Sequence, residues 1–362
     1  MRAVVLVGGF GTRLQPLTCT TPKQMLPVAG RPLIERVLEH LGGHGVEEAV
    51  LSLGYRPEVF TQAYPGGTCA GVRLRYAVEA EPLDTAGAIR FAAAHAGIDD
   101  RFLVVNGDVL SDLDLGALVD FHRAAGAEGT ISLTRVEDPS PFGVVTTTGA
   151  GRVTAFVEKP APGAAPGDLV SAGHYVLEPS VLDRIPGGRP VSVEREVFPA
   201  MVEEGTLHAR AGGTYWLGVD TPERYLQASL DLLDGAGGVG VEPGATTVVD
   251  GEVVLPSLLA DGVVVAAGAV VDRSVLGAGC RLDPGARVDR SVLLPGAVVG
   301  SGATVHRSIL GAGAAVGAGA VVDRHSVIGD GVEVAAGAVL SGARVPGPKG
   351  ATPPAPGHPP PR

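Results

Sequence analysis

The first part of the chain shows two hydrophobic patterns in alternation. Short apolar runs rich in β-branched residues, at Val4–Val7, Ala49–Leu53 and Phe102–Val105, are typical of buried strands. Apolar residues at helical spacing between Leu33 and Leu41, and again in Ala86–Ala96, predict helices between those strands. Because strand and helix alternate, we expect an α/β domain of βαβ units around a mostly parallel, Rossmann-like sheet.

A different pattern begins after the glycine-rich segment Asp234–Gly238, which is typical of a linker. The sequence Val-Asp-Arg-Ser starts at Val271 and Val288, and close variants of it start at Val305 and Val322. An aliphatic residue also recurs about every six positions, and such periodicity is the mark of a parallel β-helix. These aliphatic residues are Val264, Val270, Leu276, Leu282, Val288, Val316, Val322, Ile328, Val334 and Leu340.

The two patterns predict the domain organisation. An α/β domain over residues 1–233, closed by a helix at Pro222–Leu233, is followed by a linker over 234–245. We expect a left-handed β-helix of hexapeptide repeats over 246–344 and a disordered tail, rich in proline and glycine, over 345–362.

Composition narrows the classes of partner. The formal net charge of −11 and the lack of any run rich in lysine and arginine argue against a nucleic-acid surface. No apolar run is long enough to span a bilayer, and the N-terminus lacks the regions of a signal peptide. Cys19, Cys69 and Cys280 are far apart, so neither a disulfide framework nor a zinc site is indicated. We therefore expect a reduced, cytoplasmic protein with no nucleic-acid or membrane partner.

A glycine-rich turn, Gly8–Leu14, follows the first strand and carries Arg13, and Lys23 lies ten positions further on. Glycines let the backbone approach a ligand closely and turn its N–H groups inward, and such a nest binds anions. No Gly-Lys pair of a P-loop occurs here, and Leu14 stands where a dinucleotide fingerprint needs its last glycine. With its two positive charges, this turn predicts a site for a phosphate chain rather than a plain tight turn.

The buried run that ends in Asn106, Gly107 and Asp108 is a second candidate. Both it and the glycine-rich turn follow strands, and in open parallel sheets ligands bind beyond the carboxyl ends of the strands. One carboxylate at such an edge suits Mg²⁺, which prefers one or two carboxylates together with substrate phosphates. Taken alone, an aspartate that stabilises a turn is an equally good interpretation of Asp108.

These residues resemble a known family. Gly-Gly-x-Gly-Thr-Arg-Leu at Gly8–Leu14, followed by Pro22-Lys23, is similar to the signature of sugar-1-phosphate nucleotidyltransferases, and most similar to their mannose-1-phosphate guanylyltransferase (GDP-mannose pyrophosphorylase) branch. The resemblance implies that a sugar-1-phosphate displaces pyrophosphate from a nucleoside triphosphate, with GTP, mannose-1-phosphate and Mg²⁺ expected. It implies that Arg13 binds the β- and γ-phosphates, Lys23 the α-phosphate and Asp108 the metal. The implied nucleotide-binding residues are Leu6, Gly8, Gly9, Gly11, Thr12, Arg13, Asp84, Thr85 and Asn106.

Two further segments resemble the sugar-binding part of this family. The resemblance implies that the backbone of Gly143 approaches the sugar, that Glu158 accepts hydrogen bonds from sugar hydroxyls and that Lys159 contacts the sugar phosphate. An exposed charged turn before a proline is the alternative interpretation of the Glu-Lys pair. Ser192–Pro199 also looks like the guanylyltransferase branch, and we expect Ser192 to cap a helix there.

Three positions depart from the family pattern. Asp84 replaces a glycine in the loop that lies against the nucleoside, where it could accept hydrogen bonds from the ribose or base, or cap the following helix. Ser171 stands where the family has an asparagine that contacts the sugar. Gly218 stands where the family has a second metal-binding aspartate. Asp220 is the candidate to replace that aspartate, because alternate residues of an extended segment share a face.

The departures leave alternatives open. The same reaction on another hexose-1-phosphate or on a cyclitol (carbasugar) phosphate fits them, as does a non-catalytic regulatory protein that binds a nucleotide sugar. Acyl transfer by the β-helix, with His306 or His325 as the catalytic histidine, is a third alternative, because many acyltransferases use this fold. No inserted loop interrupts the coils, so we favour a β-helix that serves regulation or assembly into a homo-oligomer.

Overall fold

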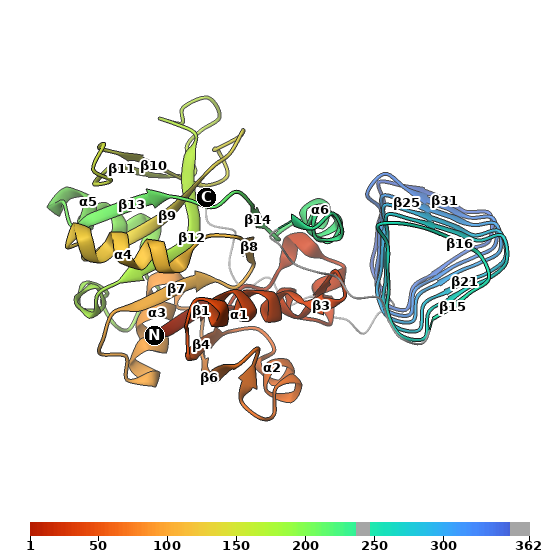
Figure 1. Cartoon of the computed structure of the whole chain (residues 1–362), viewed down its shortest axis with the longest axis horizontal. Helices are drawn as coiled ribbons and strands as arrows, with labels where there is room; N and C mark the ends of the chain where they lie inside the picture. The colour runs from red at the N-terminus through yellow and green to blue at the C-terminus, as the bar shows by residue number, and fades with distance from the viewer. Residues whose placement is uncertain (237–246, 348–362) are drawn as a thin grey trace. The chain divides into compact units, whose positions relative to one another are not determined.

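The computed structural model describes residues 1–236 and 247–347 of the chain (Figure 1). The chain forms two compact units, the first made of Met1–Gly9 and Ile34–Trp216 and the second of Phe10–Leu33 and Leu217–Arg362. Because the first boundary falls inside the glycine-rich turn, the predicted site residues are distributed over both units. Most of the predicted linker and nearly all of the predicted tail lie outside the described residues.

A mixed sheet forms the centre of the first unit. Four of its strands are parallel neighbours in the order β7-β1-β4-β6, which confirms the predicted βαβ arrangement, and antiparallel pairs extend the sheet on both sides. In spatial order the strands are β11 (Val153–Glu158), β10 (Gly143–Thr147), β12 (Leu169–Leu177), β7 (Phe102–Asn106), β1 (Arg2–Leu6), β4 (Glu48–Leu53), β6 (Val72–Val78) and β5 (Thr68–Cys69), with β9 (Gly129–Arg135) on β12 and β13 (Leu207–Ala211) on β9.

The helices predicted near Leu33–Leu41, Ala86–Ala96 and Pro222–Leu233 are present, whereas the pattern does not predict those at Pro57–Ala63 and Leu115–Ala125. The helix that begins at Leu33 ends at Gly43, and the predicted closing helix, Pro222–Leu233, has those same bounds in the structure. The predicted cap is also confirmed, because Ser192 Oγ accepts from the amide of Arg195, although the helix it caps is a π-helix. The helices are α1 (Leu33–Gly43), α2 (Pro57–Ala63), α3 (Asp84–Ala96), α4 (Leu115–Ala125), α5 (Phe198–Glu204) and α6 (Pro222–Leu233), with the 3-10 helix η4 (Pro179–Arg184) and the π-helix η5 (Val193–Val197).

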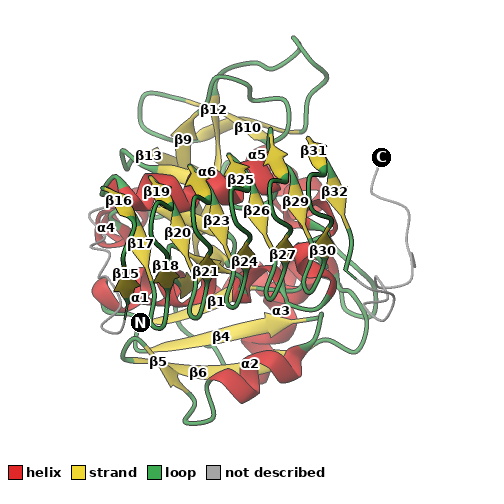
Figure 2. Cartoon of the chain, turned by 90° about the vertical axis from the view of Figure 1, so that its right-hand side faces the viewer, coloured by secondary structure: helices red, strands yellow, loops and turns green. Residues whose placement is uncertain are grey.

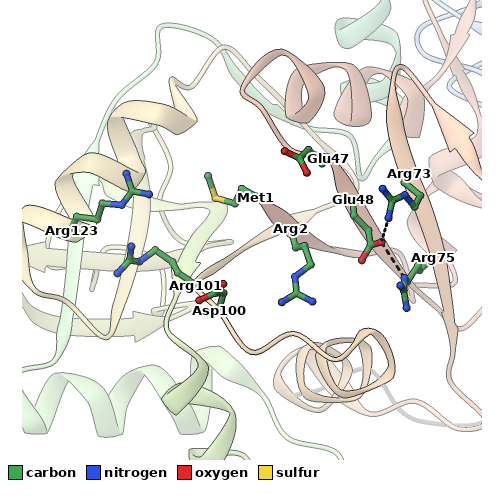
Figure 3. A pocket seen from close by; sticks show the side chains of 9 residues that line it. All are labelled: Met1, Arg2, Glu47, Glu48, Arg73, Arg75, Asp100, Arg101 and Arg123. Carbon is green, nitrogen blue, oxygen red and sulfur yellow. Dashed lines mark hydrogen bonds and ion pairs between the residues drawn. The ribbon is translucent and has the colours of Figure 1, made fainter.

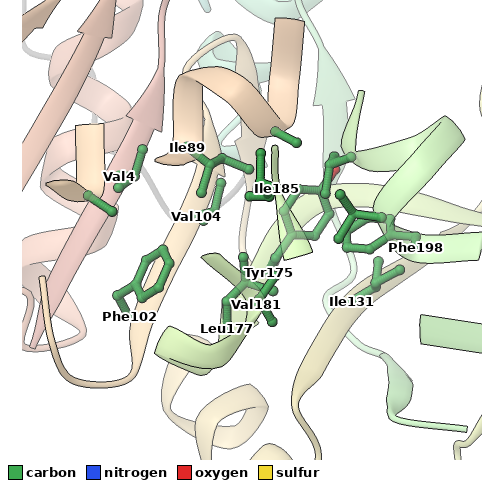
Figure 4. Packing of buried hydrophobic residues seen from close by; sticks show 14 of the residues in the cluster. Val4, Ile89, Phe102, Val104, Ile131, Tyr175, Leu177, Val181, Ile185 and Phe198 are labelled. Atoms are coloured by element: carbon green, nitrogen blue, oxygen red, sulfur yellow. The ribbon is translucent and has the colours of Figure 1, made fainter. Parts of the chain in front are cut away.

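Apolar packing against the sheet holds the first unit together. Val4 of β1 and Val104 of β7 are register partners, and both are fully buried with Ile89 of α3 in the same cluster (Figure 4). Tyr175 of β12 packs edge-on against Phe198 of α5, with ring centroids 5.1 Å apart. Burial of such side chains is the main favourable term in folding, so the strands whose ends carry the site are also the most firmly held.

The second unit begins with the segment Phe10–Leu33, which consists of short turns and a small hairpin. Its elements are η1 (Thr12–Leu14), η2 (Leu17–Cys19), η3 (Lys23–Met25), β2 (Pro27–Val28) and β3 (Arg31–Pro32). Two further short strands of the chain are β8 (Val109–Ser111) and β14 (Trp216–Gly218).

Besides α6, the second unit contains a β-helix of three six-stranded parallel sheets (Figure 2). Val264 pairs with Arg281 and Arg281 with Val298, so the chain returns one coil further on after seventeen residues. The hexapeptide prediction is confirmed, and the left-handed winding stays a prediction. The strands are β15 (Val248–Val249), β16 (Glu252–Val254), β17 (Leu258–Leu259), β18 (Val264–Val265), β19 (Val270–Asp272), β20 (Val275–Leu276), β21 (Arg281–Leu282), β22 (Arg287–Asp289), β23 (Val292–Leu293), β24 (Val298–Val299), β25 (Thr304–His306), β26 (Ile309–Leu310), β27 (Ala315–Val316), β28 (Val321–Asp323), β29 (Val327–Ile328), β30 (Glu333–Val334), β31 (Val339–Ser341) and β32 (Arg344–Val345).

The repeated Val-Asp-Arg-Ser sequence forms one corner of the coils. The valine of the motif is buried in the core. The arginine has a positive φ, a conformation that glycine adopts at the other corners. The serine is fully buried and joins successive coils: Ser291 Oγ donates to Asp289 O at 2.8 Å and accepts from the amide of Ser308 at 3.1 Å. The motif is therefore structural, because its hydroxyl satisfies a backbone N–H that the corner would otherwise bury without a partner.

Replacement of Ser291 by alanine should lower the free energy of unfolding by about 1–3 kcal/mol, because it leaves the buried amide of Ser308 without an acceptor. Urea denaturation of the full chain measures the change. Ser301→Ala, at an exposed turn of the same β-helix, is the matched control. Equal stabilities of the two variants would contradict the structural role of this corner serine.

Candidate active site

The carboxyl ends of two neighbouring parallel strands meet in the first unit. The register of β1 and β7 pairs Leu6 with Asn106, and the amide of Gly107 donates to Leu6 O at 3.0 Å. A Cβ on Gly107 would lie 2.9 Å from that same oxygen, so a larger residue would push the strand ends apart. The structure thereby brings Leu6, Asn106 and the half-buried Asp108 to one edge of the sheet.

Gly8 continues β1 along this edge. A Cβ on Gly54, which follows the neighbouring strand β4, would approach Gly8 O to 3.0 Å. Behind Gly8, Glu79 accepts hydrogen bonds from Ser52 Oγ at 2.8 Å and from the amide of Leu83 at 3.1 Å. No atom would lie within 4 Å of a Cβ on Gly9, so the backbone there is open to a ligand.

The loop that departs from the family at Asp84 owes its shape to the backbone. Asp84 has a φ of +58°, a left-handed conformation that glycine adopts freely and that aspartate tolerates better than most residues. Its Oδ1 accepts from the adjacent amide of Thr85 at 2.7 Å, and helix α3 has no side-chain cap. The predicted cap is therefore wrong, because a left-handed residue directs its carboxylate to the next amide and not to those further along the helix.

A buried carboxylate that sequence analysis did not single out lies behind Thr85. Glu194 Oε2 accepts from Thr85 Oγ1 at 2.7 Å and from Ser192 Oγ at 2.8 Å, and Thr85 Oγ1 accepts from the amide of Val193 at 2.8 Å. Burial raises the pKa of Glu194, and the charge of Glu158 raises it further. Glu194 lies in the π-helix η5, and such helices are frequent at functional sites. The only signal in the sequence was the similarity of Ser192–Pro199 to the guanylyltransferase branch.

Gly143, Glu158 and Lys159 come together on the β10–β11 pair. Gly143 is the register partner of Glu158, and a Cβ on Gly143 would lie 2.6 Å from the ring of Phe156 and 3.0 Å from Glu158 Oε2. Only glycine therefore leaves this carboxylate in place. Lys159 Nζ is 3.1 Å from Glu158 Oε1, so the two predicted contacts to the sugar and its phosphate are themselves an ion pair.

Ser171 lies on β12, where the pairing with β9 is irregular. Its hydroxyl is 3.4 Å from the hydroxyl of Tyr175. Two positions on, Gly173 has a φ of +77°, and a Cβ there would lie 2.8 Å from Nδ2 of Asn106. The irregular strand therefore brings the Ser171 segment against Asn106, and so links the predicted sugar and nucleotide residues of the first unit.

In the second unit, Gly11 organises the signature turn, Gly11–Gln15. Gly11 has a φ of +63°, and its carbonyl accepts from Thr18 Oγ1 at 2.7 Å and from the amide of Leu14 at 2.9 Å. A Cβ on Gly11 would lie 3.2 Å from Cβ of Lys23. The turn therefore packs directly against Lys23, as an anion nest with an adjacent lysine requires.

Arg13 meets a carboxylate in the same unit. Its Nη1 is 2.7 Å from Oδ2 of Asp220, which lies just before α6, while 68% of its side chain stays exposed. Oδ1 of Asp220 is buried, accepts no hydrogen bond within the described residues, and is 3.6 Å from Nη1 of Arg224. Arg13 thus keeps open donors, and Asp220 lies between the guanidinium groups of Arg13 and Arg224.

The carboxylates of the described residues limit how a metal can be held. Within residues 1–236 and 247–347, no group of three or more His, Cys, Asp or Glu side chains is arranged to hold a metal ion. One or two carboxylates with substrate phosphates are what Mg²⁺ prefers. The carboxylate of Asp108, in the first unit, fits that donor set, whereas Gly218 offers no side chain. The part of Asp220, in the second unit, in holding a metal stays a prediction.

A basic hollow of about 690 Å³ lies at the opposite, amino-terminal ends of the strands in the first unit (Figure 3). Arg73 and Arg75 converge there on Glu48, at 3.3 and 3.2 Å, and Arg2 binds Asp99 at 2.6 Å. Acidic partners thus compensate these arginines, and none of the predicted site residues lines the hollow.

Comparison with known sequences identifies the family. Residues 2–235 match the family described as nucleotidyl transferase. The chain belongs to the nucleotidyl transferase family. It is therefore an enzyme of that family, whose members generally use a divalent metal ion. Residues 244–351 match the GMPPB C-terminal domain, so the β-helix also has a counterpart among known domains.

Characterised relatives carry names that agree with this family. The mannose-1-phosphate guanylyltransferase of Mycobacterium tuberculosis is 43% identical over 272 residues, which cover 73% of this chain and 74% of the relative. The mannose-1-phosphate guanyltransferase of Hypocrea jecorina is 42% identical over 63% of each chain. HddC from Yersinia pseudotuberculosis, whose crystal structure was solved in complex with GMP-PN, is 27% identical with a TM-score of 0.55, over 64% of this chain and 99% of that one.

The nucleotidyl transferase has no helix, among those the structure describes, that is both long and apolar enough to cross a membrane.

The conformation of residue 84 gives a prediction. We expect Asp84→Ala to lower the free energy of unfolding by about 1 kcal/mol, because alanine keeps the left-handed strain and loses the bond to Thr85. Asp84→Gly should stay within about 0.5 kcal/mol of the parent, since glycine relieves the strain at an entropic cost. Thermal unfolding of the two variants compares them. Equal losses for both would mean that the carboxylate matters and the backbone conformation does not.

Proposed function

We propose that this nucleotidyl transferase transfers a guanylyl group from GTP to mannose-1-phosphate, with GDP-mannose and pyrophosphate as products. The observation that carries the proposal is the 43% identity, over 73% of the chain, to the guanylyltransferase of M. tuberculosis. The arrangement of cationic and carboxylate side chains around glycine turns in both units supports it.

The reaction is a displacement at phosphorus. An oxygen of the sugar phosphate forms a bond to the α-phosphorus of GTP while the bond from that phosphorus to the bridging oxygen of the β-phosphate breaks, and pyrophosphate leaves with the electron pair. Such a step needs in-line positioning and stabilisation of charge on the phosphates, without a covalent intermediate on the protein.

The second unit contributes the positive charge. Lys23, packed against Gly11, neutralises the α-phosphate as the bonds change, and the open donors of Arg13 bind the β- and γ-phosphates. Gly11 and Thr12 present the backbone of the turn to the triphosphate. Asp220 orients Arg13 through Oδ2, while its Oδ1 faces Arg224 at 3.6 Å.

The other residues that we propose to bind the nucleotide, and those that we propose to bind the sugar, belong to the first unit. Leu6, Gly8 and Gly9 border the nucleotide together with Asn106, and the loop of Asp84 and Thr85 lies against the nucleoside. Asp108 would hold Mg²⁺ together with the substrate phosphates. When bound, the ion adds charge stabilisation to the leaving pyrophosphate.

On the sugar side, the backbone of Gly143 and the carboxylate of Glu158 bind the sugar hydroxyls, and Ser171 provides a shorter donor than the asparagine of the family. Lys159 binds the sugar phosphate, for which it exchanges its ion pair with Glu158. Glu194, held by Thr85 and Ser192, fixes the nucleoside loop to the sugar half of the site.

We further propose that the enzyme works in the cytoplasm as a homo-oligomer joined through the β-helix. The three cysteines are free thiols, as a reducing compartment requires. Four large apolar side chains of the first coil are exposed, Val248, Val249, Val254 and Leu255, and grouped exposed apolar side chains mark interaction surfaces.

Pyrophosphate release tests the substrates. Purified enzyme with Mg²⁺ should release pyrophosphate fastest with GTP and mannose-1-phosphate, in a panel that pairs each common nucleoside triphosphate with hexose- and cyclitol-1-phosphates. Faster release with another acceptor would shift the proposal to that sugar or cyclitol. Such a change would agree with Ser171, which replaces the sugar-contacting asparagine of the family. No release with any pair would overturn it.

Removal of a charge at the reacting phosphates should be costly. We expect Lys23→Ala and Asp108→Ala each to lower kcat by about a hundredfold or more, the scale of losing one transition-state charge stabiliser. Asp183→Ala and Arg287→Ala, at exposed positions away from the site, are the matched controls. Rates equal to those of the controls would contradict the two assigned roles.

A further inference from the structure

Within the second unit, the segment Phe10–Leu33 lies against the β-helix. Thr20 Oγ1 donates to Asp330 Oδ2 at 2.6 Å. A Cβ on Gly329 would come within 3.2 Å of Cβ of Pro16, so the coil and the segment are in van der Waals contact there. The β-helix therefore touches the chain immediately after the signature turn.

Arg344 makes the closest link to the turn itself. It lies in β32 (Arg344–Val345), at the end of the described coils, and its Nη1 donates to the carbonyl oxygens of Arg13 at 3.0 Å and Gln15 at 3.3 Å. Its Nη2 donates to Oε1 of Glu223, in the first turn of α6, at 3.3 Å. One guanidinium thus joins the signature turn, helix α6 and the β-helix.

This link controls the direction of the Arg13 side chain. A bond that holds the carbonyl of Arg13 fixes the rotation between that carbonyl and its Cα, and with it the direction of Cβ. The guanidinium of Arg13 then reaches Asp220, which lies just before the same helix that Arg344 holds through Glu223. Arg344 therefore holds both the backbone of Arg13 and the helix that follows its partner.

Fixed positive charge is most effective when it needs no rearrangement as the phosphate arrives. A turn with exposed arginines has many conformations in water, and each rotamer-rich side chain that a ligand must order weakens binding. The three hydrogen bonds of Arg344 remove part of that freedom before the ligand binds.

We propose that Arg344 is a positioning residue for Arg13, so that the end of the β-helix holds the triphosphate-binding turn in its binding conformation. This inference rests on the proposed function of Arg13 in binding the β- and γ-phosphates of GTP. It gives the β-helix a part in the catalytic cycle in addition to assembly.

Steady-state kinetics of the full chain test the inference. We expect Arg344→Ala to raise the KM for GTP about tenfold, the scale of one hydrogen bond to a charged group, and to leave the KM for mannose-1-phosphate within about twofold. Arg344→Lys keeps the charge and should recover part of the loss. Arg324→Ala removes an exposed arginine of the same β-helix that makes none of these contacts, and it should behave as the parent enzyme.

The split between the two KM values separates positioning from folding, because a general loss of structure would affect both substrates. A KM for GTP in Arg344→Ala equal to that of Arg324→Ala would overturn the inference. If Arg344→Ala does not fold, Glu223→Ala removes the acceptor on α6 and should still raise the KM for GTP by about threefold, because one of the three bonds of Arg344 is lost. An unchanged KM in that variant would also overturn the inference.

Arg13→Ala distinguishes this inference from the proposed function. If the KM for GTP rises in Arg13→Ala but not in Arg344→Ala, the positioning role of Arg344 is overturned and the proposed function of Arg13 stands. An unchanged KM in Arg13→Ala overturns the role of the signature turn, and the inference with it.

Discussion

The close parallel pairing of β1 with β4 and β7 is the constraint on which the rest of this structure depends. It brings the strand ends at Leu6, Ser52 and Asn106 into one row, because parallel strands direct their carboxyl ends to the same edge. Glycines at positions 54 and 107 allow the backbones to approach that closely. The apolar cluster beneath the edge makes its position costly to change, so the polar residues beyond it have a rigid support.

Opposite charges in contact are a recurring feature of the candidate site. Arg13 pairs with Asp220, and Lys159 with Glu158, so two of the three cations proposed to bind phosphate have a carboxylate beside them. Such pairs orient long side chains that would otherwise be disordered in water. They are also partly exposed, so a phosphate with its higher charge can compete for the same donors. When a phosphate displaces these carboxylates, a metal ion bound to the phosphates would offset the added negative charge.

The β-helix has two kinds of residue with different roles. Its inward valines and corner serines serve only the coil: they fill the core and satisfy the backbone from one coil to the next. Asp330 and Arg344 use side chains of the last coils to hold the segment that contains the signature turn. A solenoid suits this task because each coil is held by its neighbours, which makes its end a stiff surface for a loop.

The sequence by itself determined the fold class, the β-helix, the helices α1, α3 and α6 with the central strands beside them, and the family resemblance, because these follow from periodicity and from motifs that are continuous in the chain. It also predicted that Gly11, Lys23 and Asp108 take part in binding a phosphate chain and its metal ion. Only the tertiary structure decided what those residues contact. The ion pair of Arg13 with Asp220, the carboxylate of Glu194 behind Thr85 and the hold of Arg344 on the turn join segments far apart in sequence, and no local pattern encodes such pairs. The left-handed backbone at Asp84 is likewise known only from the tertiary structure: glycine adopts this conformation freely, and aspartate tolerates it while its carboxylate accepts from the amide of Thr85.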